Sequence, residues 1–298
     1  MNKQLILAFS LAALAFHPVW AAPAEPTEAE IADLKKAFNE LRPKTGEVVL
    51  SDNLATLKVP EGLQYLDPKD AEFIRVKVWG NPPRASNKPL GMLVKSPQDA
   101  ASADGWGIII DYSEDGHVDD SDAAKTDYNA LLKQMQESLV ENNKERIKQG
   151  YQSIKLVGWA EPPHYDASTH KIYWAKELAF EGNDENTLNY CTRILGRRGV
   201  LELNGVASIA ALPAMRAEAQ KVIVQVDFNP GNRYADFNQS TDKLATYGVA
   251  ALVAGGVAGK MGFFKVILGF LLVAKKFVIL GVLALVAGMK KFFARHKQ

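Results

Sequence analysis

The C-terminal end of the chain carries an apolar run that is too long for a water-soluble domain. From Ala245 to Met289 the residues are largely Ala, Val, Leu, Ile, Phe and Gly. A helix needs about twenty apolar residues to cross the hydrocarbon of a bilayer, and this run is longer than that. The sequence therefore predicts a C-terminal hydrophobic helical membrane segment, with residues 241–298 forming a membrane anchor that has a basic C-terminal end.

Lysines inside the run leave its topology open. Lys265, Lys275 and Lys276 interrupt the apolar residues, and a lysine near the bilayer centre costs roughly 2.5–3.5 kcal/mol. A single span over residues 261–288, a hairpin turning at the lysine pair, and a helix lying on the lipid surface all fit this pattern. The basic residues at the chain end favour a cytoplasmic C-terminus, and glycines four residues apart are typical of self-associating membrane helices.

The N-terminus has the features of a secretory signal peptide, assigned to residues 1–22. Lys3 precedes an apolar run over residues 5–16, and small alanines suited to cleavage follow. Export exposes thiols to an oxidising environment, but Cys191 is the one cysteine of the chain, so no intrachain disulfide can form. Cys191 lies in an alternating apolar run, which predicts a buried thiol on a strand.

Charge and motifs exclude several classes of function. The 35 basic and 34 acidic residues nearly cancel, so no strong field attracts nucleic acid. The sequence contains no nucleophile elbow, phosphate-binding loop or dinucleotide fingerprint in a fitting context. We therefore expect no organic cofactor, and the expected partners are membrane lipid, a second copy of the chain or another envelope protein.

Periodicity predicts a leader with a short helix over residues 23–46 and an α+β domain over residues 47–240. Helices are expected over residues 67–79, 122–150 and 212–226, and strands over residues 47–50, 54–59, 90–95, 106–112, 154–159, 171–181, 187–195 and 200–206. Gly196 and Gly199 are expected to supply the positive φ of a tight turn. Because hairpins outnumber β-α-β units, we expect a mostly antiparallel sheet flanked by helices.

One acidic segment matches the ligand spacing of a calcium loop. Oxygen-bearing side chains occupy the first, third, fifth, ninth and twelfth positions, at Asp111, Ser113, Asp115, Asp119 and Asp122. Hard oxygen ligands suit Ca²⁺, and a glycine at the sixth position permits the sharp turn. The alternative is a strand end followed by a glycine turn, with the later aspartates capping a helix that begins at Asp122.

A second segment contains a candidate acid–base group. Glu161, His164 and Asp166 flank a rigid diproline, and two carboxylates with an imidazole can move protons. The alternative is a strand, a proline-fixed bend and a turn leading into the next strand. The histidines of the chain do not have the spacing of a zinc site.

Seven strings carry a resemblance to a known family: Trp79-Gly-Asn-Pro-Pro, Leu132-Lys-Gln-Met-Gln, Leu156-Val-Gly-Trp-Ala-Glu-Pro-Pro-His-Tyr-Asp, Lys171-Ile-Tyr-Trp-Ala-Lys-Glu-Leu, Leu195-Gly-Arg-Arg-Gly-Val-Leu, Arg233-Tyr-Ala-Asp-Phe and Tyr247-Gly-Val-Ala-Ala-Leu. They resemble a bacterial family of predicted membrane-anchored proteins catalogued as a domain of unknown function. The resemblance implies an exported domain with a C-terminal anchor, and we expect the anchor in the bacterial inner membrane and the domain in the periplasm. More loosely, the Arg197-Arg-Gly-Val-Leu hairpin followed by a helix is similar to the PsbP/Mog1-like α/β/α sandwich.

These observations favour a non-enzymatic envelope protein whose exported domain binds a partner or ligand. Two alternatives remain. One is a hydrolase-like enzyme that uses Glu161, His164 and Asp166. The other is an oligomeric membrane element in which the lysine-bearing face of the tail lines or senses a pore.

Overall fold

The computed structural model describes residues 28–79, 81, 88–102, 105–148 and 152–255. Contacts divide the chain into one compact unit that ends at Val253 and a second from Ala254 to Gln298. Within the described ranges, no helix combines the length and the apolar character required to cross a bilayer. The predicted signal peptide over residues 1–22 and the expected span over residues 261–288 lie outside these ranges.

The centre of the first unit is a seven-stranded sheet that is antiparallel throughout. In spatial order its strands are β3 (Gln64–Leu66), β4 (Gly91–Val94), β5 (Gly107–Ser113), β10 (Val200–Ser208), β9 (Thr187–Leu195), β8 (Lys171–Phe180) and β7 (Ile154–Asp166). A smaller antiparallel sheet contains β1 (Glu47–Leu50), β2 (Ala55–Lys58) and β11 (Val226–Phe228). The predicted α+β class with a mostly antiparallel sheet is confirmed.

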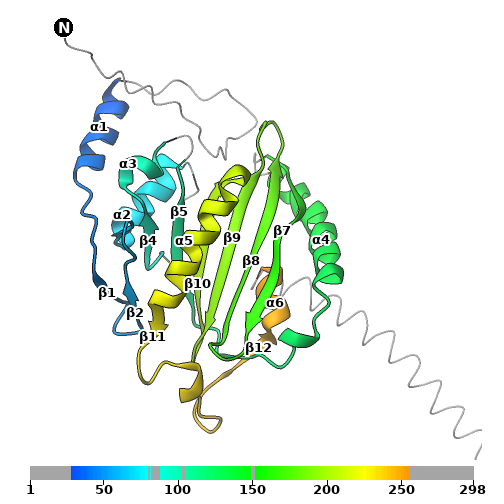
Figure 1. Cartoon of the computed structure of the whole chain (residues 1–298). Coiled ribbons are helices and arrows are strands. Elements are labelled where there is room, and N and C mark those ends of the chain that lie inside the picture. Colours follow the sequence, from blue (N-terminus) through cyan, green and yellow to red (C-terminus); the bar gives the residue numbers. More distant parts are fainter. Residues whose placement is uncertain (1–27, 80, 82–87, 103–104, 149–151, 256–298) are drawn as a thin grey trace, which may run out of the picture. The chain divides into compact units, whose positions relative to one another are not determined.

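Helices cover both faces of the large sheet (Figure 1). They are α2 (Pro68–Phe73), α3 (Pro97–Ala100), α4 (Tyr128–Lys148), α5 (Leu212–Gln225) and α6 (Val249–Ala254), whereas α1 (Glu28–Asn39) contacts the end of α2 through the Phe38 and Phe73 rings. A π-helical turn, Ile74–Val78, continues α2, and 3₁₀ turns occur at Ala123–Lys125, Ile209–Ala211 and Tyr234–Asp236. A parallel pair joins β6 (His117–Asp119) to β12 (Leu244–Gly248).

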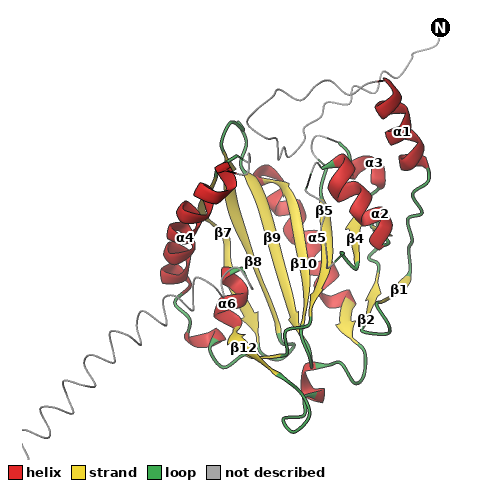
Figure 2. Ribbon diagram, turned by 180° about the vertical axis from the view of Figure 1, so that it is seen from behind, coloured by secondary structure: helices red, strands yellow, loops and turns green. Residues whose placement is uncertain are grey.

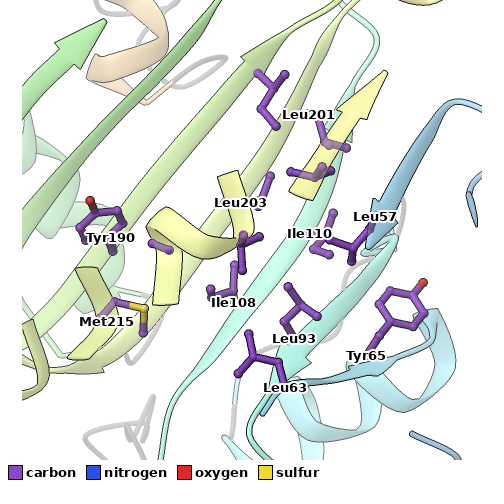
Figure 3. Close-up of a cluster of buried hydrophobic side chains, with 14 of the residues drawn as sticks. Leu57, Leu63, Tyr65, Leu93, Ile108, Ile110, Tyr190, Leu201, Leu203 and Met215 are labelled. Carbon is purple, nitrogen blue, oxygen red and sulfur yellow. The ribbon is translucent and has the colours of Figure 1, made fainter. Parts of the chain in front are cut away.

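The first face of the sheet is apolar and is covered by α5 and the small sheet. Successive side chains of a strand point to opposite faces, so alternate residues of β10 and β5, such as Leu203 and Ile108, share this face. Figure 3 shows them packed with Met215 of α5 and Leu57 of β2. Burial of such side chains stabilises the fold by roughly 25 cal/mol per Å² of apolar surface removed from water.

The second face has two separate apolar clusters. One contains Trp174 and Cys191 of the sheet together with Leu252 of α6. The other contains Ile109 of β5 and Ile74 after α2. Figure 2 views this face, with α4 and α6 on one side of the central strands and α2 and α3 on the other. The first-face cover and these helices give the layered α/β/α arrangement expected from the sequence. The predicted buried thiol is confirmed, because Cys191 is 1% exposed.

The predicted helix from Asp122 begins later than expected. The segment from Ala123 to Lys125 is a 3₁₀ turn, and α4 starts at Tyr128. Asp127 caps it, since one of its carboxylate oxygens accepts hydrogen bonds from the backbone N–H groups of residues 129 and 130 at 3.0 Å. Asp122 instead accepts the backbone N–H groups of residues 249 and 250, at the start of α6. It therefore caps a helix more than a hundred residues away in the sequence.

β7 runs through the diproline instead of bending there. The strand extends from Ile154 to Asp166, and irregularities in its pairing with β8 absorb the prolines. Prolines are tolerated because β7 is an edge strand whose outer N–H groups need no ladder partner. Two side chains of α4, Gln136 and Asn143, bond the β7 backbone and cover this edge.

The Gly196-Arg-Arg-Gly199 turn needs its glycines for space. Neither has a positive φ, so the expectation of a left-handed backbone was wrong. A Cβ at Gly199 would stand 2.1 Å from the carbonyl oxygen of Ser113, and one at Gly196 would stand 2.6 Å from the Phe228 ring. The neighbouring strand and the β11 side chain approach too closely for any larger residue.

The first part of the predicted anchor belongs to the folded unit. β12 pairs with β6, and Tyr247, Val249 and Leu252 are buried in the cluster that contains Trp174. By composition these residues resemble the apolar tail, so the domain was expected to end at residue 240. Their contacts show that it continues to Val253.

Candidate functional site

Polar side chains occupy the central strands of the second face, between its two apolar clusters. We call Ser113, Asn189, Arg193, Glu202 and Asn204 the polar strip. Strand register places Arg193 opposite Glu202, and Cys191 of one apolar cluster opposite Asn204. Asn204 in turn faces Ile109 of the other cluster. Along β10 the first-face residues are buried, whereas Glu202 and Asn204 are half-buried. The middle of the sheet is therefore partly open to solvent on this side.

Arg193 contacts two other members of the strip. Its guanidinium lies 3.2 Å from a Glu202 carboxylate oxygen and donates to the Asn204 side-chain oxygen at 3.0 Å. The hydroxyl of Ser113 donates to the other Glu202 oxygen at 2.6 Å. The Arg193 and Glu202 side chains are 9% and 21% exposed, so their charges cancel in a region of low dielectric.

β12 lies beside the strip. The Tyr247 hydroxyl donates to Asp115 at 2.7 Å. Burial, then the carboxylates of Asp115 and Glu202, raise the pKa of Tyr247, while the Arg193 guanidinium acts in the opposite direction. The tyrosine therefore lies within electrostatic range of the strip, and the strip and the C-terminal part of the domain share a boundary.

Four rings form an aromatic column where β6 meets the C-terminal segment. The column consists of Phe237, His117, Tyr234 and His170 in that order. The His117 ring centre lies 4.0 Å from that of Phe237 and 4.2 Å from that of Tyr234. Tyr234 stacks on His170 at 3.9 Å. The column joins residues 234–237 to β6 and to the turn before β8.

Asp120 lies beside the column and accepts a hydrogen bond from Tyr165. The His170 Nδ1 atom lies 3.1 Å from the same carboxylate oxygen. Burial opposes ionisation of Asp120, but hydrogen bonds from Tyr165, His170 and Tyr234 outweigh it and lower its pKa. Burial and the Asp120 carboxylate raise the pKa of Tyr165. The anionic Asp120 carboxylate, held by two neutral hydroxyls, therefore joins the loop after β6 to the end of β7 and to the 3₁₀ turn that begins at Tyr234.

The three acid–base candidates have separate surroundings. Glu161 pairs with Arg216 of α5 at 2.8 Å, on the first face. The His164 ring centre lies 5.1 Å from that of Tyr173. Asp166 accepts from Ser168 and Thr169 in the turn before β8, and these bonds lower its pKa to about 2. In the described part of the chain, no hydrogen bond joins these three residues to one another, and the acid–base role stays a prediction.

The five calcium candidates also have protein partners. Asp115 accepts from Tyr247, and Asp122 caps α6. Asp119 accepts the backbone N–H of Ser121 at 2.7 Å, and Ser113 donates to Glu202. Asp111 lies opposite Glu202 in register. Over the described ranges, no group of three or more His, Cys, Asp and Glu side chains is arranged to hold a metal ion. Calcium binding stays a prediction that calorimetry tests.

The strip was not found from the sequence, although one signal was present. The run Val200-Leu-Glu-Leu-Asn alternates between apolar and polar residues, which is typical of a strand with one wet face. A central strand with a solvent-exposed polar face indicates an open binding surface. The sequence alone cannot show that this strand lies in the centre of the sheet. The partners of the strip come from β5 and β9, so their meeting depends on strand order.

The sequence profile of the family described as "Protein of unknown function (DUF2167)" matches residues 42–286. The chain belongs to this family. The resemblance expected from the sequence is thereby confirmed. A search of curated proteins gave no match.

Three solved structures are similar to the chain at low identity. Cyanobacterial PsbP (CyanoP) from Synechocystis sp. PCC 6803 is 9% identical, with a TM-score of 0.35, covering 63% of this chain and 92% of its own. LpqN of Mycobacterium tuberculosis, involved in cell envelope biogenesis, is 16% identical, with a TM-score of 0.34 and coverage of 70% and 100%. The Saccharomyces cerevisiae Ran-binding protein Mog1p is 13% identical, with a TM-score of 0.34 and coverage of 67% and 100%. The likeness to PsbP and Mog1 noted from the sequence is thus found among solved structures.

Proposed function

We propose that this member of the family is a membrane-anchored envelope protein whose exported domain binds a ligand on the polar strip. The observation that carries the proposal is the half-buried Glu202 and Asn204 on a central strand of the sheet. The signal-like N-terminus and the apolar C-terminal run support the location.

Polar groups buried in the middle of a sheet cost free energy unless they form hydrogen bonds. Burying an unpaired polar group costs roughly 1–3 kcal/mol, and apolar residues would join the two clusters of the second face into one core. The strip instead separates them and keeps hydrogen-bonding capacity. Arg193 occupies the side-chain oxygen of Asn204, and within the described part of the chain the amide NH₂ of Asn204 donates to no residue. That group is available to a ligand.

Site-specific photocrosslinking tests the proposal in intact cells. A benzoylphenylalanine in place of Asn204 should form an adduct on irradiation. The same residue in place of Asn129, which is exposed on α4, should not form it. Purified wild-type protein added in excess to permeabilised cells should compete for the adduct. Identical products at both positions, or no product at position 204, would count against a ligand on the strip.

A further inference from the structure

We infer that residues 244–253 are a displaceable cover that limits access to the polar strip, a form of regulation that rests on the proposed function. We call these residues, which comprise β12 and most of α6, the strap. The place of the strap on the sheet, its attachment to the domain and its border with the strip each support this role.

The strap packs on sheet residues that flank the strip. Arg193 lies between Cys191 and Leu195 on the second face of β9, because alternate residues of a strand share a face. Cys191 and Leu195 are both buried in one cluster with Leu252 of the strap. Arg193 is buried too, whereas its partner Glu202 on β10 is half-buried. The seated strap therefore covers the side of the strip on which the guanidinium lies.

The strap is attached to the domain mainly through the short segment that contains β6. Among the described residues, β12 pairs with no strand except β6, through two register pairs with a shift between them. The Tyr247 hydroxyl donates to Asp115, and Asp122 accepts the backbone N–H groups at the start of α6. Because the strap forms no hydrogen-bond ladder with the seven-stranded sheet beneath it, it can open locally while that sheet stays intact.

Tyr247 lies at the border between strap and strip. The charges of Glu202 and Arg193 both act on its hydroxyl. The end of β5 also connects the two parts, since Ser113 donates to Glu202 and Asp115, two residues later, accepts from Tyr247. A substitution that loosens Tyr247 should therefore act on the strip directly.

A surface that is open in only a fraction of the molecules binds more weakly than one that is always open. The apparent affinity is the intrinsic affinity multiplied by the open fraction. Fixing the strap in its seat should therefore lower ligand binding on the strip, and loosening the strap should raise it.

A disulfide that fixes the strap tests the inference. A Cβ at Gly248 would lie 2.7 Å from the Cγ atom of Asp122, so Asp122→Cys with Gly248→Cys brings two sulfur atoms within bonding reach. The pair is introduced into a full-length Cys191→Ala chain with benzoylphenylalanine in place of Asn204. Permeabilised cells are treated with diamide, which forms the disulfide, or with dithiothreitol, which reduces it. We expect the photoadduct at position 204 to be at least about fivefold weaker in the oxidised protein.

Two comparisons separate the strap from other effects of the reagents. The Cys191→Ala chain without the added cysteine pair should give the same adduct yield with diamide and with dithiothreitol. Tyr247→Phe removes the bond to Asp115 without any disulfide. In a chain that keeps Cys191, it should raise the adduct yield and the rate of thiol labelling, each by up to about tenfold for one lost hydrogen bond.

The outcomes distinguish the regulation from the binding function. An adduct that is as strong in the oxidised protein as in the reduced one, or stronger, would overturn the inference and leave the binding function in place. If the cysteine pair does not oxidise, Tyr247→Phe decides alone, and an adduct yield no higher than with the unaltered strap would overturn the inference. Loss of the adduct in every chain, the reduced one included, would remove the binding function itself.

Discussion

The guanidinium of Arg193 lies 5.2 Å from the centre of the Trp174 ring. The indole is buried in the apolar cluster of the second face, whereas the guanidinium belongs to the polar strip. An aromatic face attracts a cation, so this contact holds the charge of Arg193 at the border between cluster and strip. The guanidinium edge is thereby left to bond Glu202 and Asn204.

Removal of Arg193 should destabilise the domain through Glu202. We expect Arg193→Met to lower the free energy of unfolding by about 2–3 kcal/mol, somewhat less than for a fully buried pair because Glu202 keeps some contact with water. The double variant Arg193→Met, Glu202→Met should recover much of this loss, because no unpaired charge remains. Urea unfolding of the full-length protein measures both. A double variant no more stable than the single one would show that the ion pair is not the cause.

Lys171 should stabilise the C-terminal end of α5. Its ammonium donates to the carbonyl oxygens of Ile223 at 2.8 Å and Val226 at 3.0 Å, where the helix dipole is negative. Lys171→Met should cost about 1–3 kcal/mol of unfolding free energy. Lys221→Met is the control, because Lys221 pairs with Glu218 at the surface and should contribute less than about 0.5 kcal/mol. Equal denaturation midpoints for the two variants would contradict this role.

Gly199→Ala should be among the more harmful small substitutions in the chain. The new methyl group would stand 2.1 Å from the carbonyl oxygen of Ser113, so β5 and β10 would have to separate locally. We expect a loss of at least about 2 kcal/mol, measured by thermal or urea unfolding. At Gly158 a Cβ meets no heavy atom within 4 Å, so Gly158→Ala should be neutral. A harmless Gly199→Ala would show that the strands do not approach this closely.

The aromatic column should hold the C-terminal part of the domain in place. Phe237→Ala removes one face of the His117 stack, and local opening should then expose Cys191, which is buried with Tyr247 and Val249. We expect a thiol reagent to label Cys191 about tenfold faster, equal to ~1.4 kcal/mol of local stability. Val224→Ala, at a site 73% exposed on α5, is the control and should not change the rate. An unchanged labelling rate in Phe237→Ala would show that the aromatic column does not stabilise the core around Cys191.

The proposed membrane anchor should lie beyond the folded unit. Full-length protein should stay with membranes washed in alkaline carbonate, whereas a chain ending at Gly255 should be released in soluble form with its fold intact, as circular dichroism would show. The truncation keeps all of α6 and the buried residues before it. Release of the full-length protein by carbonate, or retention of the truncated one, would contradict the anchor.

Local pattern was sufficient to predict most strands of the large sheet. Alternation and turn residues indicated the β9–β10 hairpin, and Asp67-Pro68 indicated the start of α2, where Asp67 accepts the N–H groups of Lys69 and Asp70. Such signals act over a few residues, so they are visible without a fold. The short strands β3, β6, β11 and β12 were missed, because three to five residues carry too little periodicity and their pairing partners lie far away.

The apolar composition of the tail, the lack of an intrachain disulfide and the antiparallel α+β class followed from the sequence by itself, since composition and short-range periodicity determine them, whereas the signal peptide and the membrane anchor stay predictions. The polar strip and the aromatic column were decided by tertiary structure. Ser113 and Glu202 are 89 residues apart, and His117 meets Tyr234 through the parallel pairing of β6 with β12. The order of the strands in the sheet determines which distant residues meet. That order depends on burying both faces of the sheet at once, and no single segment of the chain encodes it.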